Sequence, residues 1–135
     1  MRRSILPFLV FLVSVVLALP AAASDHHVNA TLSPVGGSGV SGRVELTALP
    51  GGGTRITVVA MGLTPGTEYL SLYYDNGTCE VEPYSADDVI GHYTAGPGGT
   101  ATVTAKVDDD LDEIHSVSVR LAQDFSLQAC AGVNP

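Results

Sequence analysis

Short β-forming runs separated by turn-forming residues constrain the fold of this chain more than any other feature. No segment after residue 23 has the period of an amphipathic helix. Clusters such as LPGGG, LTPGT and AGPGG separate the runs and are typical of tight turns. We expect strands at residues 28–32, 42–49, 54–61, 67–74, 89–94, 99–107, 115–121 and 127–130. This spacing predicts an all-β Greek-key sandwich or flattened barrel of about eight antiparallel strands.

An export signal is expected at residues 1–23. Two arginines precede an apolar run of about 15 residues, which is shorter than the roughly 20 residues of a membrane span. The small residues at the end of LPAAAS fit a cleavage site, so the mature chain is expected to start at Ser24. The residues after the arginine pair favour ordinary secretion over the twin-arginine route. We therefore expect one secreted or periplasmic domain over residues 24–135, without membrane insertion after removal of the signal.

The mature chain is strongly acidic. All 14 acidic residues lie after residue 23, against four basic residues, which gives a formal charge of −10. A surface of this charge repels nucleic acid and anionic lipid, so neither is expected as a partner. An extracellular protein partner remains compatible with the composition, and the sequence does not identify one.

The chain has two cysteines, Cys79 and Cys130. In an oxidising compartment an even number of cysteines favours a disulfide, and only one pairing exists here. Because aromatic residues are few and the strands are rich in glycine and alanine, such a bridge would matter for stability. The alternative is two buried free thiols.

Cleavage before Ser24 would leave Ser24, Asp25 and His26 as the first three residues. A free amino group, two deprotonated backbone amides and an imidazole in third place offer four nitrogens in one plane. Cu(II) and Ni(II) prefer this geometry. The sequence thus predicts a Cu(II) site in the tail, as the alternative to a protein without a cofactor.

Other motifs give weaker signals. The acidic run 108–113 lacks the glycine and glutamate positions of an EF-hand, so we interpret it as a solvated loop. His92 and His115 stand alone in or beside expected strands, where packing or surface exposure is commoner than metal ligation. No nucleophile motif and no phosphate-binding glycine loop occurs in a suitable context.

Three segments resemble the copper/zinc superoxide dismutase family and its small secreted relatives. They are GLTPGTEYLSLYYDNGTC (62–79), SVSVRLAQD (116–124) and QACAGV (128–133). In that family a glycine-leucine turn leads into a strand of pattern His-x-His, and a cysteine after that strand bridges to one near the C-terminus. The resemblance implies the Greek-key sandwich and supports the Cys79–Cys130 bridge.

The resemblance also shows departures. Ser71 and Tyr73 stand at the His-x-His positions. When SVSVRLAQD is aligned with the strand that carries the last copper histidine, Arg120 falls on the position of that histidine. Hydroxyl, phenol and guanidinium groups do not replace three imidazoles. By alternation we expect Leu70 and Leu72 to face the core.

The same alternation places Ser71 and Tyr73 on the opposite face, where they could form a binding patch with Arg120. The alternative is a solvated sheet face that merely kept the fold. We therefore expect a non-catalytic superoxide dismutase-like domain with a structural or binding role. The alternatives are copper handling by the tail and a divergent dismutase with other ligands.

Overall fold

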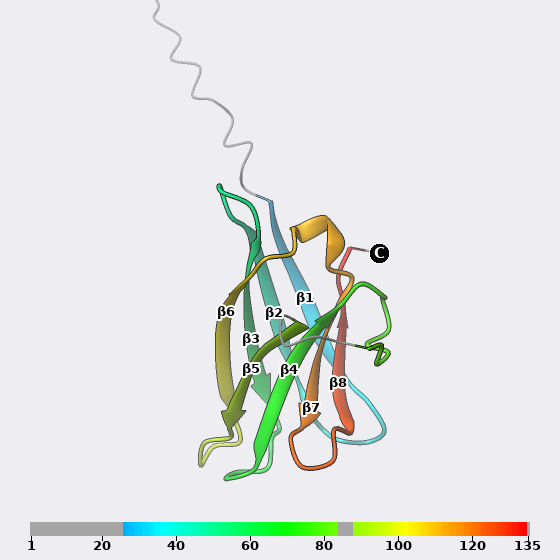
Figure 1. Cartoon of the computed structure of the whole chain (residues 1–135). Helices are drawn as coiled ribbons and strands as arrows, with labels where there is room; N and C mark the ends of the chain where they lie inside the picture. The colour runs from blue at the N-terminus through cyan, green and yellow to red at the C-terminus, as the bar shows by residue number, and fades with distance from the viewer. Residues whose placement is uncertain (1–25, 84–87, 135) are drawn as a thin grey trace, which may run out of the picture.

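The computed structural model describes residues 26–83 and 88–134. Eight strands form, each within two residues of its expected bounds, and all strand pairs are antiparallel (Figure 1). They are β1 (His27–Pro34), β2 (Ser41–Ala48), β3 (Thr54–Met61), β4 (Glu68–Tyr74), β5 (Val89–Thr94), β6 (Ala101–Val107), β7 (Ser116–Leu121) and β8 (Leu127–Gly132). The all-β prediction is confirmed.

The strands form one eight-stranded sheet in the order β5-β4-β7-β8-β1-β2-β3-β6. After β3 the chain crosses to form the β4–β5 hairpin and then returns as β6 beside β3. It crosses again to place β7 beside β4. These crossings are Greek-key connections, and they fold the sheet into a flattened barrel (Figure 1).

The flattened barrel has two layers, β1-β2-β3-β6 and β5-β4-β7-β8. Their inner faces form the main core. Alternate residues of the strands face this core, as the sequence predicts. Among them, Val44, Ile56, Val58, Val117 and Val119 are almost inaccessible to solvent. Most of these side chains are small or aliphatic, so the two layers approach closely.

The edge strands β5 and β6 close the barrel by packing. None of the strand pairings of the described residues joins β5 to β6, although the two strands lie side by side. Gly91 of β5 makes this approach possible, because a Cβ there would lie 2.7 Å from Cγ2 of Val103 in β6. A side chain at position 91 would therefore force β5 and β6 apart.

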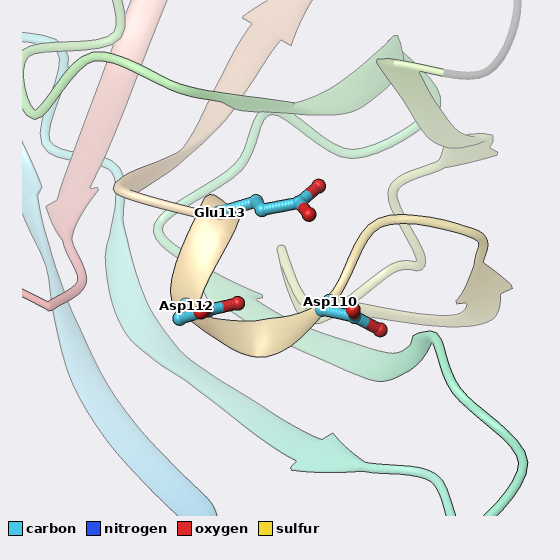
Figure 2. Close-up of side chains that lie close together, drawn as sticks. All are labelled: Asp110, Asp112 and Glu113. Atoms are coloured by element: carbon cyan, nitrogen blue, oxygen red, sulfur yellow. The ribbon is translucent and has the colours of Figure 1, made fainter.

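A short 3₁₀ helix, η2 (Leu111–Glu113), crosses one end of the barrel between β6 and β7. Figure 2 shows the carboxylates of Asp110, Asp112 and Glu113 around this turn. All three residues are exposed, as expected for this acidic stretch. The start of β1 and the C-terminal end lie at the same end of the barrel (Figure 1).

Candidate functional site

The expected patch of Ser71, Tyr73 and Arg120 is not an accessible surface, which corrects the sequence-based interpretation. Ser71 is 0% exposed and Tyr73 is 5% exposed. In the β4–β7 register they lie opposite Val119 and Val117, which are main-core residues. Ser71 and Tyr73 therefore face the interior of the barrel.

The other face of β4 is buried as well. Leu70, Leu72 and Tyr74 form a second apolar cluster with Cys79. Phe125 and Leu127 pack against this cluster, so the chain after β4 and the turn after β7 cover the outer side of the sheet. Because both faces of β4 are covered, alternation alone did not reveal which one faces the barrel interior.

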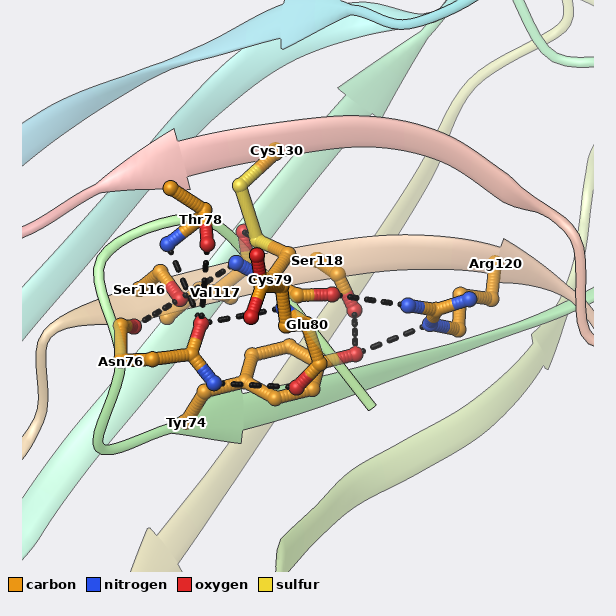
Figure 3. The surroundings of a disulfide bond; sticks show 10 residues. All are labelled: Tyr74, Asn76, Thr78, Cys79, Glu80, Ser116, Val117, Ser118, Arg120 and Cys130. Carbon is orange, nitrogen blue, oxygen red and sulfur yellow. Dashed lines mark hydrogen bonds between the residues drawn. A yellow bond between two sulfur atoms is a disulfide. The ribbon is translucent and has the colours of Figure 1, made fainter. Parts of the chain in front are cut away.

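Arg120 lies on the outer side, opposite Leu70 in the register, so it does not meet Tyr73. Its side chain is buried, and each guanidinium nitrogen donates a hydrogen bond; Figure 3 draws the two that go to Tyr74 and Cys79. Nε donates to the Tyr74 hydroxyl at 2.9 Å, Nη1 to the Phe125 carbonyl at 2.8 Å and Nη2 to the Cys79 carbonyl at 2.8 Å. The guanidinium also lies 4.8 Å from the centre of the Phe125 ring.

These contacts show what the positions aligned with copper ligands do here. The Ser71 and Tyr93 hydroxyls lie 2.8 Å apart and share a hydrogen bond. Burial raises the pKa of Tyr93 to about 12, because a phenolate at this position would lose most of its hydration. Ser71 and Arg120 lie on opposite faces of the sheet. These positions do not fit a copper ion, and they act as structural elements.

The disulfide between Cys79 and Cys130 is present, as the sequence predicts. It ties the loop after β4 to β8, and the free-thiol alternative is excluded for this structure. Cys79 adopts a left-handed backbone conformation with φ of 57°. Its N–H donates to the Ser116 hydroxyl and its carbonyl accepts from Arg120, so side chains of β7 hold this unusual residue in place.

A groove of about 720 Å³ opens at the barrel end that carries η2. This volume is in the range of small-ligand sites. Three of the four histidines of the chain line the groove together with two aspartates. The lining residues are His26, His27, Val28, Ala48, Leu49, Gly53, Asp110, Leu111, Asp112, His115 and Asn134.

His115 is the histidine of the groove that the fold holds most firmly. Its backbone N–H donates to Tyr74 and its carbonyl accepts from Val133. The ring Nδ1 lies 3.1 Å from the Asn134 carbonyl, which only accepts, so Nδ1 carries the proton. In the neutral imidazole this tautomer leaves the lone pair on Nε2, for which no hydrogen-bond partner occurs within the described residues.

His26, the one described residue of the predicted tail site, lines the same groove, as does His27. Ser24 and Asp25 lie outside the described residues. His26 is exposed, and its carbonyl, which the planar nitrogen set does not use, accepts a hydrogen bond from the Ala48 N–H at 2.9 Å. His27 is already engaged, with Nδ1 2.9 Å from the Thr47 hydroxyl and Nε2 3.1 Å from the Asn29 amide oxygen.

The acidic residues at η2 could offer carboxylate oxygens to a metal ion, but they do not define a metal site by themselves. One carboxylate oxygen from each of Asp110, Asp112 and Glu113 lies within 4.8 Å of the others. Asp110 is partly committed, since its Oδ1 accepts the Gly53 N–H at 2.9 Å. Exposed acidic groups like these are usually solvated.

His92 lies away from the groove, on the exposed side of β5, where its Nδ1 is 3.3 Å from a Glu68 carboxylate oxygen. From the sequence, His115 was interpreted like His92, as an isolated histidine in or beside a strand. The groove was not predicted, because His115 and the tail are nearly 90 residues apart in the chain. The antiparallel pairing of β1 with β8 and of β8 with β7 brings them to one barrel end.

No protein-family model matches this sequence, and no curated protein matches it. The part of the chain that the structure describes holds no helix with the length and hydropathy needed to cross a bilayer. The disulfide is compatible with an exported protein.

Proposed function

We propose that this chain is an exported, non-catalytic binding protein that holds a divalent transition-metal ion, Cu(II) first, where its N-terminal tail meets the histidine groove. The observation that carries the proposal is the convergence of His26, His27 and His115 on one groove. Imidazole nitrogens supported by carboxylates are preferred ligands of Cu(II) and Zn(II).

The tail and the groove have different roles in this proposal. The amine of Ser24, the amides of Asp25 and His26 and the His26 imidazole supply the planar nitrogens. His115, directly before β7, offers a further nitrogen, with the tautomer of its neutral ring set by the Asn134 carbonyl. Asp112 adds negative charge beside a cation.

A non-catalytic role follows from the positions that resemble copper ligands. A dismutase must cycle copper between two oxidation states at a site that superoxide reaches. Ser71 and Tyr73 are enclosed in the core and Arg120 is held by three hydrogen bonds. The likeness to superoxide dismutases is therefore proposed for the fold alone, and the chain would retain the sandwich as a scaffold.

Export is part of the proposal, because the tail chelate needs a free amine at Ser24. The apolar run of residues 5–19 and the small residues before Ser24 support cleavage there. A disulfide that ties β8 to the loop after β4 supports folding in an oxidising compartment.

The test is a Cu(II) titration of the chain starting at Ser24, followed by visible absorption and calorimetry. Wild type should bind one Cu(II) with the violet-shifted band of four nitrogen ligands. The His26→Ala variant should lose this band. The His115→Ala variant should keep the band but bind about tenfold more weakly. The His92→Ala variant is the matched control and should bind like wild type.

Two results would overturn the proposal. Tight binding of one copper by His26→Ala would place the ion away from the tail. Unchanged affinity in His115→Ala, with folding verified by circular dichroism, would exclude the groove from the site. Acetylation of the amine serves as a chemical control and should abolish the band.

A further inference from the structure

The outer face of the β1-β2-β3-β6 layer presents an ordered array of side chains. Three rows of outward side chains run across all four strands, with one residue from each strand in each row, and the outward pair Ser41 and Met61 of β2 and β3 lies beyond them. The rows are His27-Thr47-Arg55-Lys106, Asn29-Glu45-Thr57-Thr104 and Thr31-Arg43-Val59-Thr102. Neighbouring side chains in a row are about 5 Å apart, as the strand spacing requires.

This face collects every exposed basic residue of the described chain. Arg43, Arg55 and Lys106 lie on it, and the fourth base of the mature sequence, Arg120, is buried. Of the 14 acidic residues of the chain, Glu45 is the one that occupies a position in the array. Its carboxylate lies 3.5 Å from Arg43 Nε, so the array has a net positive charge on a protein of formal charge −8.

The rest of the face is rich in uncharged hydrogen-bonding groups. Five threonines and Asn29 surround the cations, and Val59 is the one aliphatic residue among the twelve. The Thr57 and Thr104 hydroxyls lie 3.0 Å apart across the β3–β6 pair. The array contains no Phe, Tyr or Trp, so stacking on flat rings would contribute nothing to recognition.

We propose that this threonine-cation face binds an anionic polysaccharide, one with sulfate or carboxylate groups along a sugar chain. The three cations match spaced anionic groups by charge. The threonine and asparagine side chains match sugar hydroxyls as hydrogen-bond donors and acceptors. Arg43, Arg55 and Lys106, the cations of this surface, do not line the metal groove, which shares only His27 with the array, so the inference does not depend on the proposed function.

Charge distribution favours a polysaccharide over nucleic acid or an anionic bilayer. Both of those present dense negative charge over a wide area, which would meet the acidic residues at the barrel end as well as this face. A single polysaccharide chain is narrow enough to contact the array alone. Binding held by three exposed cations would weaken as salt is raised.

The experiment compares retention of the chain starting at Ser24 on immobilised dextran sulfate, polygalacturonate and uncharged dextran at low ionic strength. Dextran shares its backbone with dextran sulfate, so this pair isolates the charge. Wild type should be retained on at least one anionic column, be released by about 0.5 M NaCl and pass through dextran. The column that retains it identifies sulfate or carboxylate as the recognised group.

Variants then test the face itself. Replacing Arg43, Arg55 and Lys106 together by glutamine should weaken binding about tenfold or more. A matched variant adds Glu68→Gln, Asp75→Asn and Glu80→Gln, three exposed positions away from the array, and so restores the wild-type net charge. It should bind as weakly as the triple variant.

Several results would overturn the inference. On the columns, these results are that wild type passes through both anionic columns, or that dextran retains it equally well. For the variants, they are that the triple variant is retained as strongly as wild type, or that restoring the net charge alone restores binding. Equal affinity for phosphatidylglycerol vesicles would also overturn it, since the face would then bind anions without regard to sugar. Thermal unfolding of each variant verifies that it is folded.

Discussion

The guanidinium of Arg120 donates a hydrogen bond of 2.8 Å to the carbonyl oxygen of Cys79. This bond joins the C-terminal part of β7 to the half-cystine that anchors the loop after β4. The same guanidinium binds Tyr74 and Phe125, and no ion-pair partner for it occurs among the described residues. Carbonyls, a phenol and a ring face stabilise this buried cation in place of a carboxylate.

Replacing Arg120 by methionine should destabilise the fold by about 2–4 kcal/mol. The change keeps the apolar stem but leaves two buried carbonyls and the Tyr74 hydroxyl without this donor. Urea unfolding measures the effect. Arg43→Met, at an exposed position, is the control and should change stability by less than about 0.5 kcal/mol. Equal effects of the two substitutions would contradict a structural role for Arg120.

The unfolded but unreduced protein should not react with a thiol reagent. Cys79 and Cys130 are bridged across 51 positions of sequence, and reduction should lower stability by up to about 4 kcal/mol because the open chain gains entropy when unfolded. Reagent labelling and mass spectrometry measure the thiols. Two labelled cysteines per chain before reduction would disprove the bridge.

Stability should fall above pH 10 because of Tyr93. Its pKa is about 12 in the folded protein, against about 10 for an accessible tyrosine, so the folded state binds the proton more tightly. Between these pH values only the unfolded state releases it, and unfolding becomes easier. We expect a loss of about 1 kcal/mol between pH 9 and pH 11 that is missing from Tyr93→Phe. Parallel unfolding curves for both proteins at the two pH values would refute this.

A version of the chain starting at Val28 should not dismutate superoxide after loading with copper and zinc. This version lacks the tail, and Ser71, Tyr73 and Arg120 give the metal no site in the sandwich. The activity assay is run with and without a chelator, so that free copper is recognised. Chelator-resistant turnover would mean that the barrel holds a catalytic metal through other ligands.

The strands were predictable because turn-forming clusters separate runs of clear alternation. The pairs Val44/Leu46 and Ile56/Val58 face the core as expected. Alternation failed at Ser71 and Tyr73, since it separates two faces without showing which one faces the interior. The answer depended on the Phe125 turn and the Cys79 loop, which cover the outer side of β4.

The residues of the groove could be predicted only in part. His26 was predicted as a ligand from a local pattern, its third place in the expected mature chain. His115 and Asp112 belong to the groove through the crossing of the barrel end by η2, which depends on long-range pairing. The face of threonines and cations was likewise hidden, because a row of the array joins one residue from each of four strands.

The bridge between Cys79 and Cys130 also decides how this domain would respond to mechanical force. If a load pulls on the N-terminal and C-terminal ends of the chain, tension passes directly from Cys79 to Cys130, across the sulfur atoms. Residues 80–129 between them, which include β5, β6 and β7, carry no load even when the strands separate. Roughly 170 Å of chain length is thereby kept in reserve, at about 3.4 Å per residue, and reduction of one covalent bond would release it.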